Sequence, residues 1–139
     1  MNVKEYLGQA YRIDQRINAK LEQVSALRDL AHKASTTLSE AAGGGTRNVH
    51  SMEGLSAKIV DMETEINADI DTLVDLKAEI SAAIKAIANP EYQTLLELRY
   101  LCFHSWERIA IEMKYDLRYL YKLHGCALEQ CAPFLHPKH

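Results

Sequence analysis

The chain has 139 residues, 47% of them hydrophobic, and a formal net charge of −3 at pH 7, so it can form one modest core or a helical rod carrying a small domain. Only six glycines and three prolines interrupt it, which favours helices. No apolar run approaches the ~20 residues of a membrane span or forms a signal peptide, so we expect a cytoplasmic protein without membrane segments. Three cysteines cannot all pair, so no structural disulfides are expected and Cys102 is predicted to be a core residue.

The amino-terminal part predicts one long helix, because its apolar residues recur at steps of three and four. The run Gly43-Gly44-Gly45 should end this helix, since three successive glycines lose too much backbone entropy to stay helical. We therefore predict a flexible glycine-rich loop near residues 43–50. The apolar stripe consists of Val3, Tyr6, Ala10, Ile13, Ile17, Leu21, Val24, Leu27, Ala31, Ala34 and Leu38.

A second stripe of the same spacing predicts a second long helix, which Asn89 and Pro90 close. Each helix would have about 35 to 40 residues and be roughly 55 Å long, and equal lengths suggest an antiparallel hairpin over residues 1–89. Pro90 would open a further helix with Asn89 as its cap. The second stripe is Leu55, Ile59, Met62, Ile66, Ile70, Leu73, Leu76, Ile80, Ile84 and Ile87, and Leu95, Leu96, Leu98 and Leu101 would bury the helix that follows.

Two short helices are predicted after residue 104. Ser105 can cap a helix over Trp106–Met113, and Asp116 can cap a second helix after a break at Lys114, Tyr115 and Asp116. The inner face of the pair would hold Ile109, Ala110, Met113, Leu120, Leu123, Ala127 and Leu128, with Trp106 helping to join the helices. Arg118, Tyr119 and Lys122 then fall on the opposite face of the second helix.

This segment resembles the helix-turn-helix of region four in bacterial sigma factors, as found in small phage and prophage proteins of Gram-positive bacteria. The resemblance lies in Trp106-Glu107-Arg108-Ile109-Ala110, Met113, Tyr115, Tyr121-Lys122-Leu123-His124-Gly125 and Ala127-Leu128. Several similar proteins regulate late genes, so the resemblance implies a helix-turn-helix domain over residues 90–139 and a DNA-binding transcription regulator. Such proteins tend to place Gly where this chain has Lys114, and a left-handed lysine would cost about 1 kcal/mol.

Double-stranded DNA is the partner that this reading implies. In a helix-turn-helix, the first turns of the second helix enter the major groove, where Arg can bond guanine bidentately and Lys can reach phosphates. We therefore predict that Arg118, Tyr119 and Lys122 face the groove. Ser105, Arg108 and Lys114 are predicted to lie near phosphates.

Charge is distributed unevenly along the chain. Residues 1–89 have a net charge of −3 and residues 105–139 a net charge of +1. A dedicated DNA-binding protein usually has a more basic surface, so one copy should bind weakly, and a homodimer or a partner such as RNA polymerase would supply the remaining affinity. A homodimer would also cover the two apolar stripes; a monomeric hairpin is the alternative.

Other functions have weaker support. The acidic side chains from Glu53 to Glu79 form either a solvated face or a surface that docks a basic host protein, in which case the helix-turn-helix is a packing unit only. Cys126, Cys131, His136 and His139 offer zinc ligands, but their spacing matches no familiar zinc finger, so no metal or other cofactor is predicted. No nucleophile motif, phosphate-binding loop or dinucleotide fingerprint occurs, so we do not expect an enzyme; His124 is more plausible as a packed residue than as a base.

Overall fold

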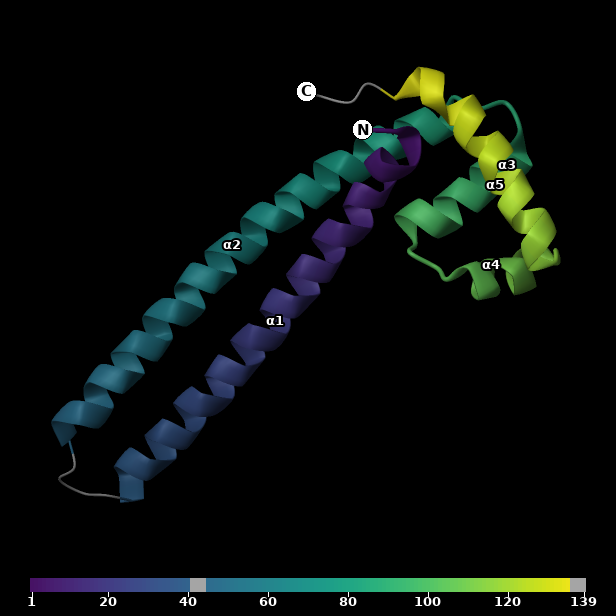
Figure 1. The fold of residues 1–139 in the computed structure, drawn as a ribbon. Helices are drawn as coiled ribbons and strands as arrows, with labels where there is room; N and C mark the ends of the chain where they lie inside the picture. Colours follow the sequence, from purple (N-terminus) through teal and green to yellow (C-terminus); the bar gives the residue numbers. More distant parts are fainter. Residues whose placement is uncertain (41–44, 136–139) are drawn as a thin grey trace. The chain divides into compact units, whose positions relative to one another are not determined.

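The computed structural model describes residues 1–40 and 45–135, and the side chains within those ranges apart from residues 37–51. Over these ranges the protein is all-α, with five α-helices and no strand (Figure 1). No helix there combines the length and apolar character needed to cross a membrane. The helices are α1 (Val3–Glu40), α2 (Gly45–Lys85), α3 (Pro90–Leu96), α4 (Trp106–Met113) and α5 (Leu117–Cys131), with a π-helical turn η1 (Glu97–Leu101) and a 3-10 turn η2 (Ala132–Phe134).

The start of α2 corrects the predicted loop near residues 43–50. Residues 45–50 are helical, whereas residues 43 and 44 lie outside the described residues. Glycine costs about 1 kcal/mol relative to alanine inside a helix, but Gly45 is the first residue of α2. Thr46 to His50 include no further glycine or proline that would break the helix.

The chain forms two compact units. One, here called the terminal unit, consists of residues 1–13 and 72–139, and the other, the central unit, of residues 14–71. The predicted domain boundary at residues 89 and 90 follows the change in sequence pattern. The boundaries between the two compact units lie instead within α1 and within α2. Leu7 of α1 and Ile80 and Ile84 of α2 are fully buried, so the ends of the long helices belong to the core of the terminal unit.

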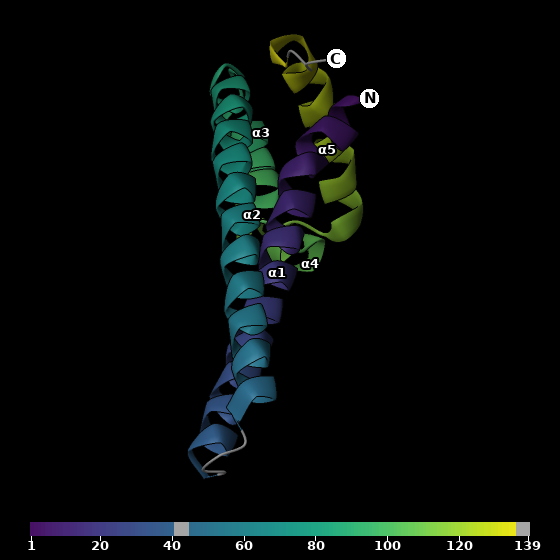
Figure 2. The ribbon, with the colours of Figure 1, turned by 90° about the vertical axis from the view of Figure 1, so that its left-hand side faces the viewer.

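Within the central unit, the α1 and α2 segments run antiparallel. Lys20 pairs with Asp69 at 2.6 Å and Arg28 with Glu63 at 2.9 Å, so positions rise along α1 as they fall along α2 (Figures 1 and 2). The predicted stripes are only partly covered in this unit. Ile17, Val24 and Ile66 of the stripes are buried, whereas Leu21 and Ile70 are exposed, as are Leu30 and Val60 beside the stripes.

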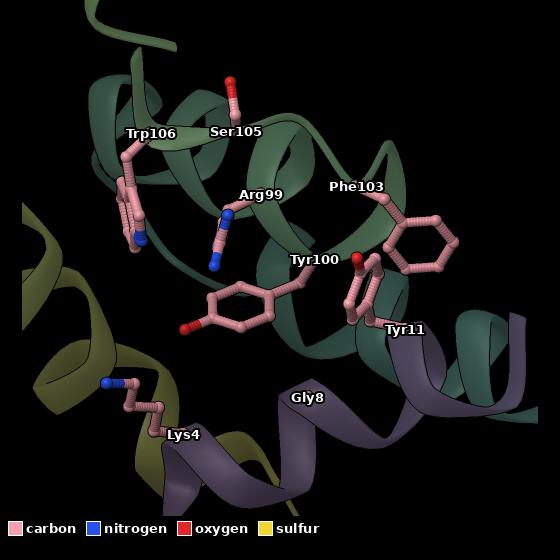
Figure 3. Close-up of a pocket in the computed structure, with 8 residues that line it drawn as sticks. All are labelled: Lys4, Gly8, Tyr11, Arg99, Tyr100, Phe103, Ser105 and Trp106. Carbon is pink, nitrogen blue, oxygen red and sulfur yellow. The ribbon is translucent and has the colours of Figure 1, made fainter. Parts of the chain in front are cut away.

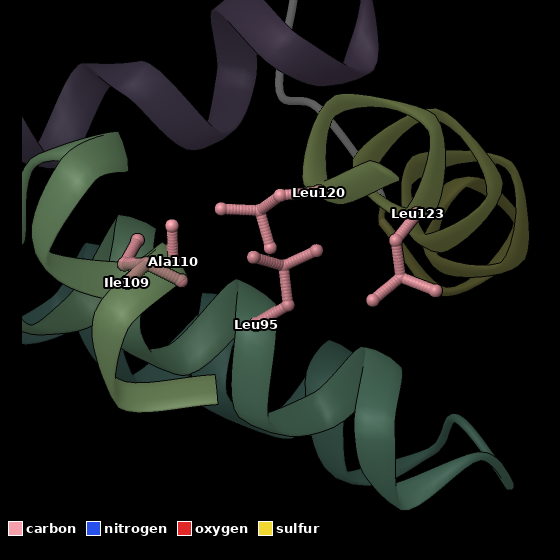
Figure 4. Close-up of a cluster of buried hydrophobic side chains, with 5 residues drawn as sticks. All are labelled: Leu95, Ile109, Ala110, Leu120 and Leu123. Atoms are coloured by element: carbon pink, nitrogen blue, oxygen red, sulfur yellow. The ribbon is translucent and has the colours of Figure 1, made fainter. Parts of the chain in front are cut away.

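In the terminal unit, α3, α4 and α5 enclose a small apolar core. Asn89 caps α3 as predicted, because its side-chain oxygen accepts hydrogen bonds from the backbone N–H groups of Glu91 and Tyr92 at 2.9 and 3.3 Å. Trp106 and Met113 are partly buried and pack against the core. Its buried members are Leu95 from α3, Ile109 and Ala110 from α4, and Leu120 and Leu123 from α5 (Figure 4).

Candidate nucleic-acid interface

Helix α4 begins and ends at the residues that the sequence indicates, and α5 begins where it indicates. The Ser105 hydroxyl accepts a hydrogen bond from the backbone N–H of Arg108 at 3.2 Å, which caps α4. The Asp116 carboxylate accepts one from the backbone N–H of Tyr119 at 2.8 Å, which caps α5. Both caps satisfy donors that a helix leaves free at its first turn, so they fix where each helix starts.

The turn between the two helices depends on Lys114. This residue has φ 61° and ψ 43°, the left-handed conformation expected if lysine replaces glycine after α4. Its backbone N–H donates to the carbonyls of Ala110 and Ile111, and the N–H of Tyr115 donates to Ala110 at 3.0 Å. Lysine therefore closes the turn at the cost of about 1 kcal/mol of backbone strain.

The outer face of α5 presents the predicted groove residues to solvent. Arg118, Tyr119 and Lys122 are all exposed, and their spacings of three and four residues place Lys122 beside the other two on the helix. Tyr119 is 46% exposed, and its ring lies 4.8 Å from that of Tyr115. The Tyr115 hydroxyl donates a hydrogen bond to Glu91 of α3, so the ring that Tyr119 packs against is held in place.

The three residues predicted near phosphates lie in different settings. Ser105 is exposed, but its oxygen is already used as the cap of α4. Arg108 is exposed and its Nε donates to Glu112 on the same helix at 3.1 Å, which offsets its charge. Lys114 is exposed in the turn. Of the three, Lys114 therefore has the side chain most available for a phosphate.

Charges on the exposed surface of α4 and α5 nearly balance. Close alternation of sign lowers the attraction for a polyanion, because each carboxylate repels the phosphates that a neighbouring cation attracts. One copy of this surface therefore offers no net positive charge to DNA. The exposed cations are Arg108, Lys114, Arg118 and Lys122, and the exposed acids are Glu107, Glu112, Asp116 and Glu129.

His124 is packed inside the terminal unit, as predicted. Its Nε2 lies 2.6 Å from the Tyr100 hydroxyl, and its ring meets the edge of Trp106 at 4.6 Å between centroids. Burial, together with the positive charges of Lys4 and Arg99, lowers the pKa of His124 to about 4. The partner Tyr100 comes from η1, 24 residues earlier, so no local sequence signal identifies it.

The cysteines do not form a metal site in the part of the chain that the structure describes. Cys126 is exposed and Cys131 is buried, so the two thiols lie in different environments, and no three potential ligands gather there. His136 and His139 lie outside the described residues. Cys102 was predicted in the core but is exposed. Its backbone N–H bonds to the carbonyl of Glu97 in the π-helical turn, which is wider than an α-helical turn, so Cys102 lies on a different face from the one that α-helical spacing predicts.

Comparison of the chain with protein-family models, curated proteins and solved structures finds no match. Function is therefore inferred from the residues and their geometry. The relevant features are two capped helices, a tight turn between them and an exposed polar face on the second helix.

Proposed function

We propose that the protein is a sequence-specific DNA-binding transcription regulator of the phage or prophage type, acting in the bacterial cytoplasm. In this proposal α4 and α5 act as a helix-turn-helix, and residues 1–89 act as a long antiparallel hairpin for assembly or partner docking. The supporting observation is the exposure of Arg118, Tyr119 and Lys122 along the first turns of a capped helix. The buried cluster that includes Ile109 and Leu120 supports a fixed angle between α4 and α5.

The groove-facing side chains would have different roles in DNA recognition. Arg118 would bond the edge of a guanine, which identifies a base, and Lys122 would reach a phosphate, which sets the position of the helix. Tyr119 can donate its hydroxyl to a phosphate or stack, while Tyr115 supports its ring. Lys114 would approach the backbone from the turn.

Affinity should come from more than one copy or from a partner. The four exposed cations of α4, α5 and the turn between them would release about four counterions at most, so the affinity of one copy for DNA should be low and should depend only weakly on salt. A homodimer would present two α5 helices, and the exposed apolar residues Leu21, Leu30 and Val60 are candidates for its interface. Contact with RNA polymerase is the other source of affinity that we propose.

The test is recovery of DNA crosslinked to the tagged protein in cells, compared with an Arg118→Ala, Lys122→Ala double variant. A matched control is Arg16→Ala, Lys58→Ala, which removes the same charge from exposed positions in the central unit. We expect discrete peaks for the natural protein and the control, and none for the α5 variant. Peaks that persist in the α5 variant would contradict the assigned face.

A second proposal is that the acidic side of α2 docks a host protein and that α4 and α5 only pack. Asp61, Asp71 and Asp75 are exposed, which favours it. Glu63 and Asp69, however, form ion pairs with α1, so part of the acidic pattern serves helix pairing instead. The two proposals differ in their DNA behaviour, because only DNA binding depends on operator sequence and weakens linearly with salt on a log scale.

A further inference from the structure

A cavity of about 350 Å³ lies within the terminal unit, among the first turns of α1, the turn η1 and the start of α4 (Figure 3). Four aromatic rings and two cationic side chains line it, and none of its described lining residues is acidic. This size lies within the range of small-molecule sites. The aromatic and cationic lining residues are Tyr11, Tyr100, Phe103, Trp106, Lys4 and Arg99.

The backbone at this cavity is unusual in two ways. Arg99 and Tyr100 belong to the π-helical turn η1, a conformation that is rare and often occurs at functional sites. Phe103 has φ 60°, which is a strained value for a bulky residue. Contacts hold Phe103 there: its ring lies 5.5 Å from that of Tyr11, and the Lys77 ammonium lies 4.7 Å from its centroid.

The two cations have no carboxylate partner at the cavity. The Arg99 Nη1 donates to the carbonyl of His104 at 3.0 Å, and its guanidinium lies 4.6 Å from the centre of the Trp106 ring, which leaves other N–H donors of the fork. Within the described residues, the Lys4 side chain makes no hydrogen bond or ion pair. Figure 3 shows Arg99 reaching between Trp106 and Tyr100.

Gly8 lines this cavity on the side of α1. A Cβ atom added at Gly8 would meet nothing within 4 Å, so no close packing requires glycine there. Glycine inside a helix is about 1 kcal/mol less favourable than alanine. Gly8 therefore makes α1 less stable than alanine would, and no packing contact explains why glycine is there. The open space beside Gly8 belongs to the cavity that Gly8 lines.

We propose that this cavity binds a small aromatic anion, a flat ring that carries a phosphate, as in a nucleoside monophosphate. The phosphate would lie between Lys4 and Arg99, since a guanidinium fork matches phosphate oxygens. The ring would stack against the aromatic walls, chiefly Trp106 and Tyr11. The proposed groove contacts Arg118, Tyr119 and Lys122 do not line this cavity, and of the residues predicted near phosphates only Ser105 does, so nucleotide binding can be tested separately from DNA binding.

Trp106 provides a direct readout, because it is the single tryptophan of the chain and lines the cavity. The experiment titrates the full chain with adenosine monophosphate and guanosine monophosphate and follows tryptophan fluorescence. Adenosine supplies the ring without the anion, and inorganic phosphate supplies the anion without the ring. We expect a saturable change with a nucleotide and binding weaker by about tenfold or more with either half alone.

Three variants connect the signal to the cavity. Lys4→Gln should weaken nucleotide binding about tenfold or more, since a charge-assisted contact is lost. Gly8→Leu should abolish binding by filling the cavity, whereas Gly54→Leu, at a helical glycine of the central unit that also has open space, should leave binding unchanged. Thermal melting of each variant verifies that it is folded.

Several outcomes would overturn the proposal. Absence of nucleotide binding to the folded natural chain would remove it, as would undiminished binding to folded Gly8→Leu. Phosphate alone binding as tightly as the nucleotide would refute the aromatic part. If Gly8→Leu failed to fold, loss of binding in folded Lys4→Gln would support the site, and unchanged binding there would refute it.

Discussion

Protonation of His124 should destabilise the terminal unit in mild acid. Its side chain is only 7% exposed, and burial together with Lys4 and Arg99 lowers its pKa to about 4 in the folded chain, against the ordinary 6.5. Because the unfolded chain holds this proton more tightly, acid favours unfolding. Stability from the neutral ring is complete above about pH 6.5 and is lost progressively as the pH falls from there to about 4.

The size of the effect follows from the two pKa values. Moving from well above both values to well below both would cost about 3 kcal/mol of unfolding free energy. At about pH 5 the unfolded chain is almost fully protonated at this residue while the folded chain is not, so roughly 2 kcal/mol should already be lost. That is a large fraction of the stability of an ordinary domain.

Urea unfolding at about pH 7.5 and about pH 5, followed by the fluorescence of Trp106, measures this loss in the terminal unit. The matched variant is His124→Gln, whose side chain can still form a hydrogen bond with the Tyr100 hydroxyl but does not titrate. Other groups titrate equally in both chains, so the difference between the two pH dependences isolates His124. An identical loss in the natural chain and the variant would refute the reasoning.

Three further predictions follow from single contacts. Tyr100→Phe should lower the unfolding free energy by about 1 kcal/mol at neutral pH, because the buried His124 nitrogen loses its partner, and an unchanged urea midpoint would argue against that bond. Lys114→Gly should raise the free energy of unfolding by about 1 kcal/mol, and with it the urea midpoint, since glycine adopts φ 61° without strain. A lower urea midpoint would show that the lysine side chain stabilises the fold by more than the backbone strain costs. Lys20→Ala should raise the pKa of Asp69 towards its ordinary value, because the hydrogen bond from Lys20 is the main cause that lowers it, and a carboxyl titration by NMR would show an unmoved pKa if another group were responsible.

The features that the sequence predicted well are those that depend on neighbouring residues. A helix cap needs a polar side chain within three residues of the N–H group that it accepts from, and Asn89, Ser105 and Asp116 satisfy that condition in the sequence itself. The limits of α4 and the break at Lys114 follow from the same local chemistry. The exposure of Arg118, Tyr119 and Lys122 follows from helical spacing alone.

Features that depend on distant residues escaped prediction. The bond between Tyr100 and His124 joins η1 to α5, and the π-helical turn that directs Tyr100 inward has no pattern in the sequence that distinguishes it from an ordinary turn. The cavity at Gly8 needs the first turns of α1 beside residues 99–106. Exposed Cys102 shows the same limit, because a wider turn before it changes which face it occupies.

An apolar repeat also leaves the register of two helices undetermined, because a slip of seven residues matches apolar positions again. In the central unit, Lys20 removes this ambiguity in the register of α1 against α2. It occupies a position in the seven-residue spacing with Ile13 and Leu27, its side chain is only 17% exposed, and Asp69 meets it at 2.6 Å. A slipped pair would leave both charges partly covered without partners, which costs more than the pair contributes. The ion pair therefore acts mainly by selecting one alignment of α1 and α2, a task that the surrounding leucines and isoleucines cannot perform.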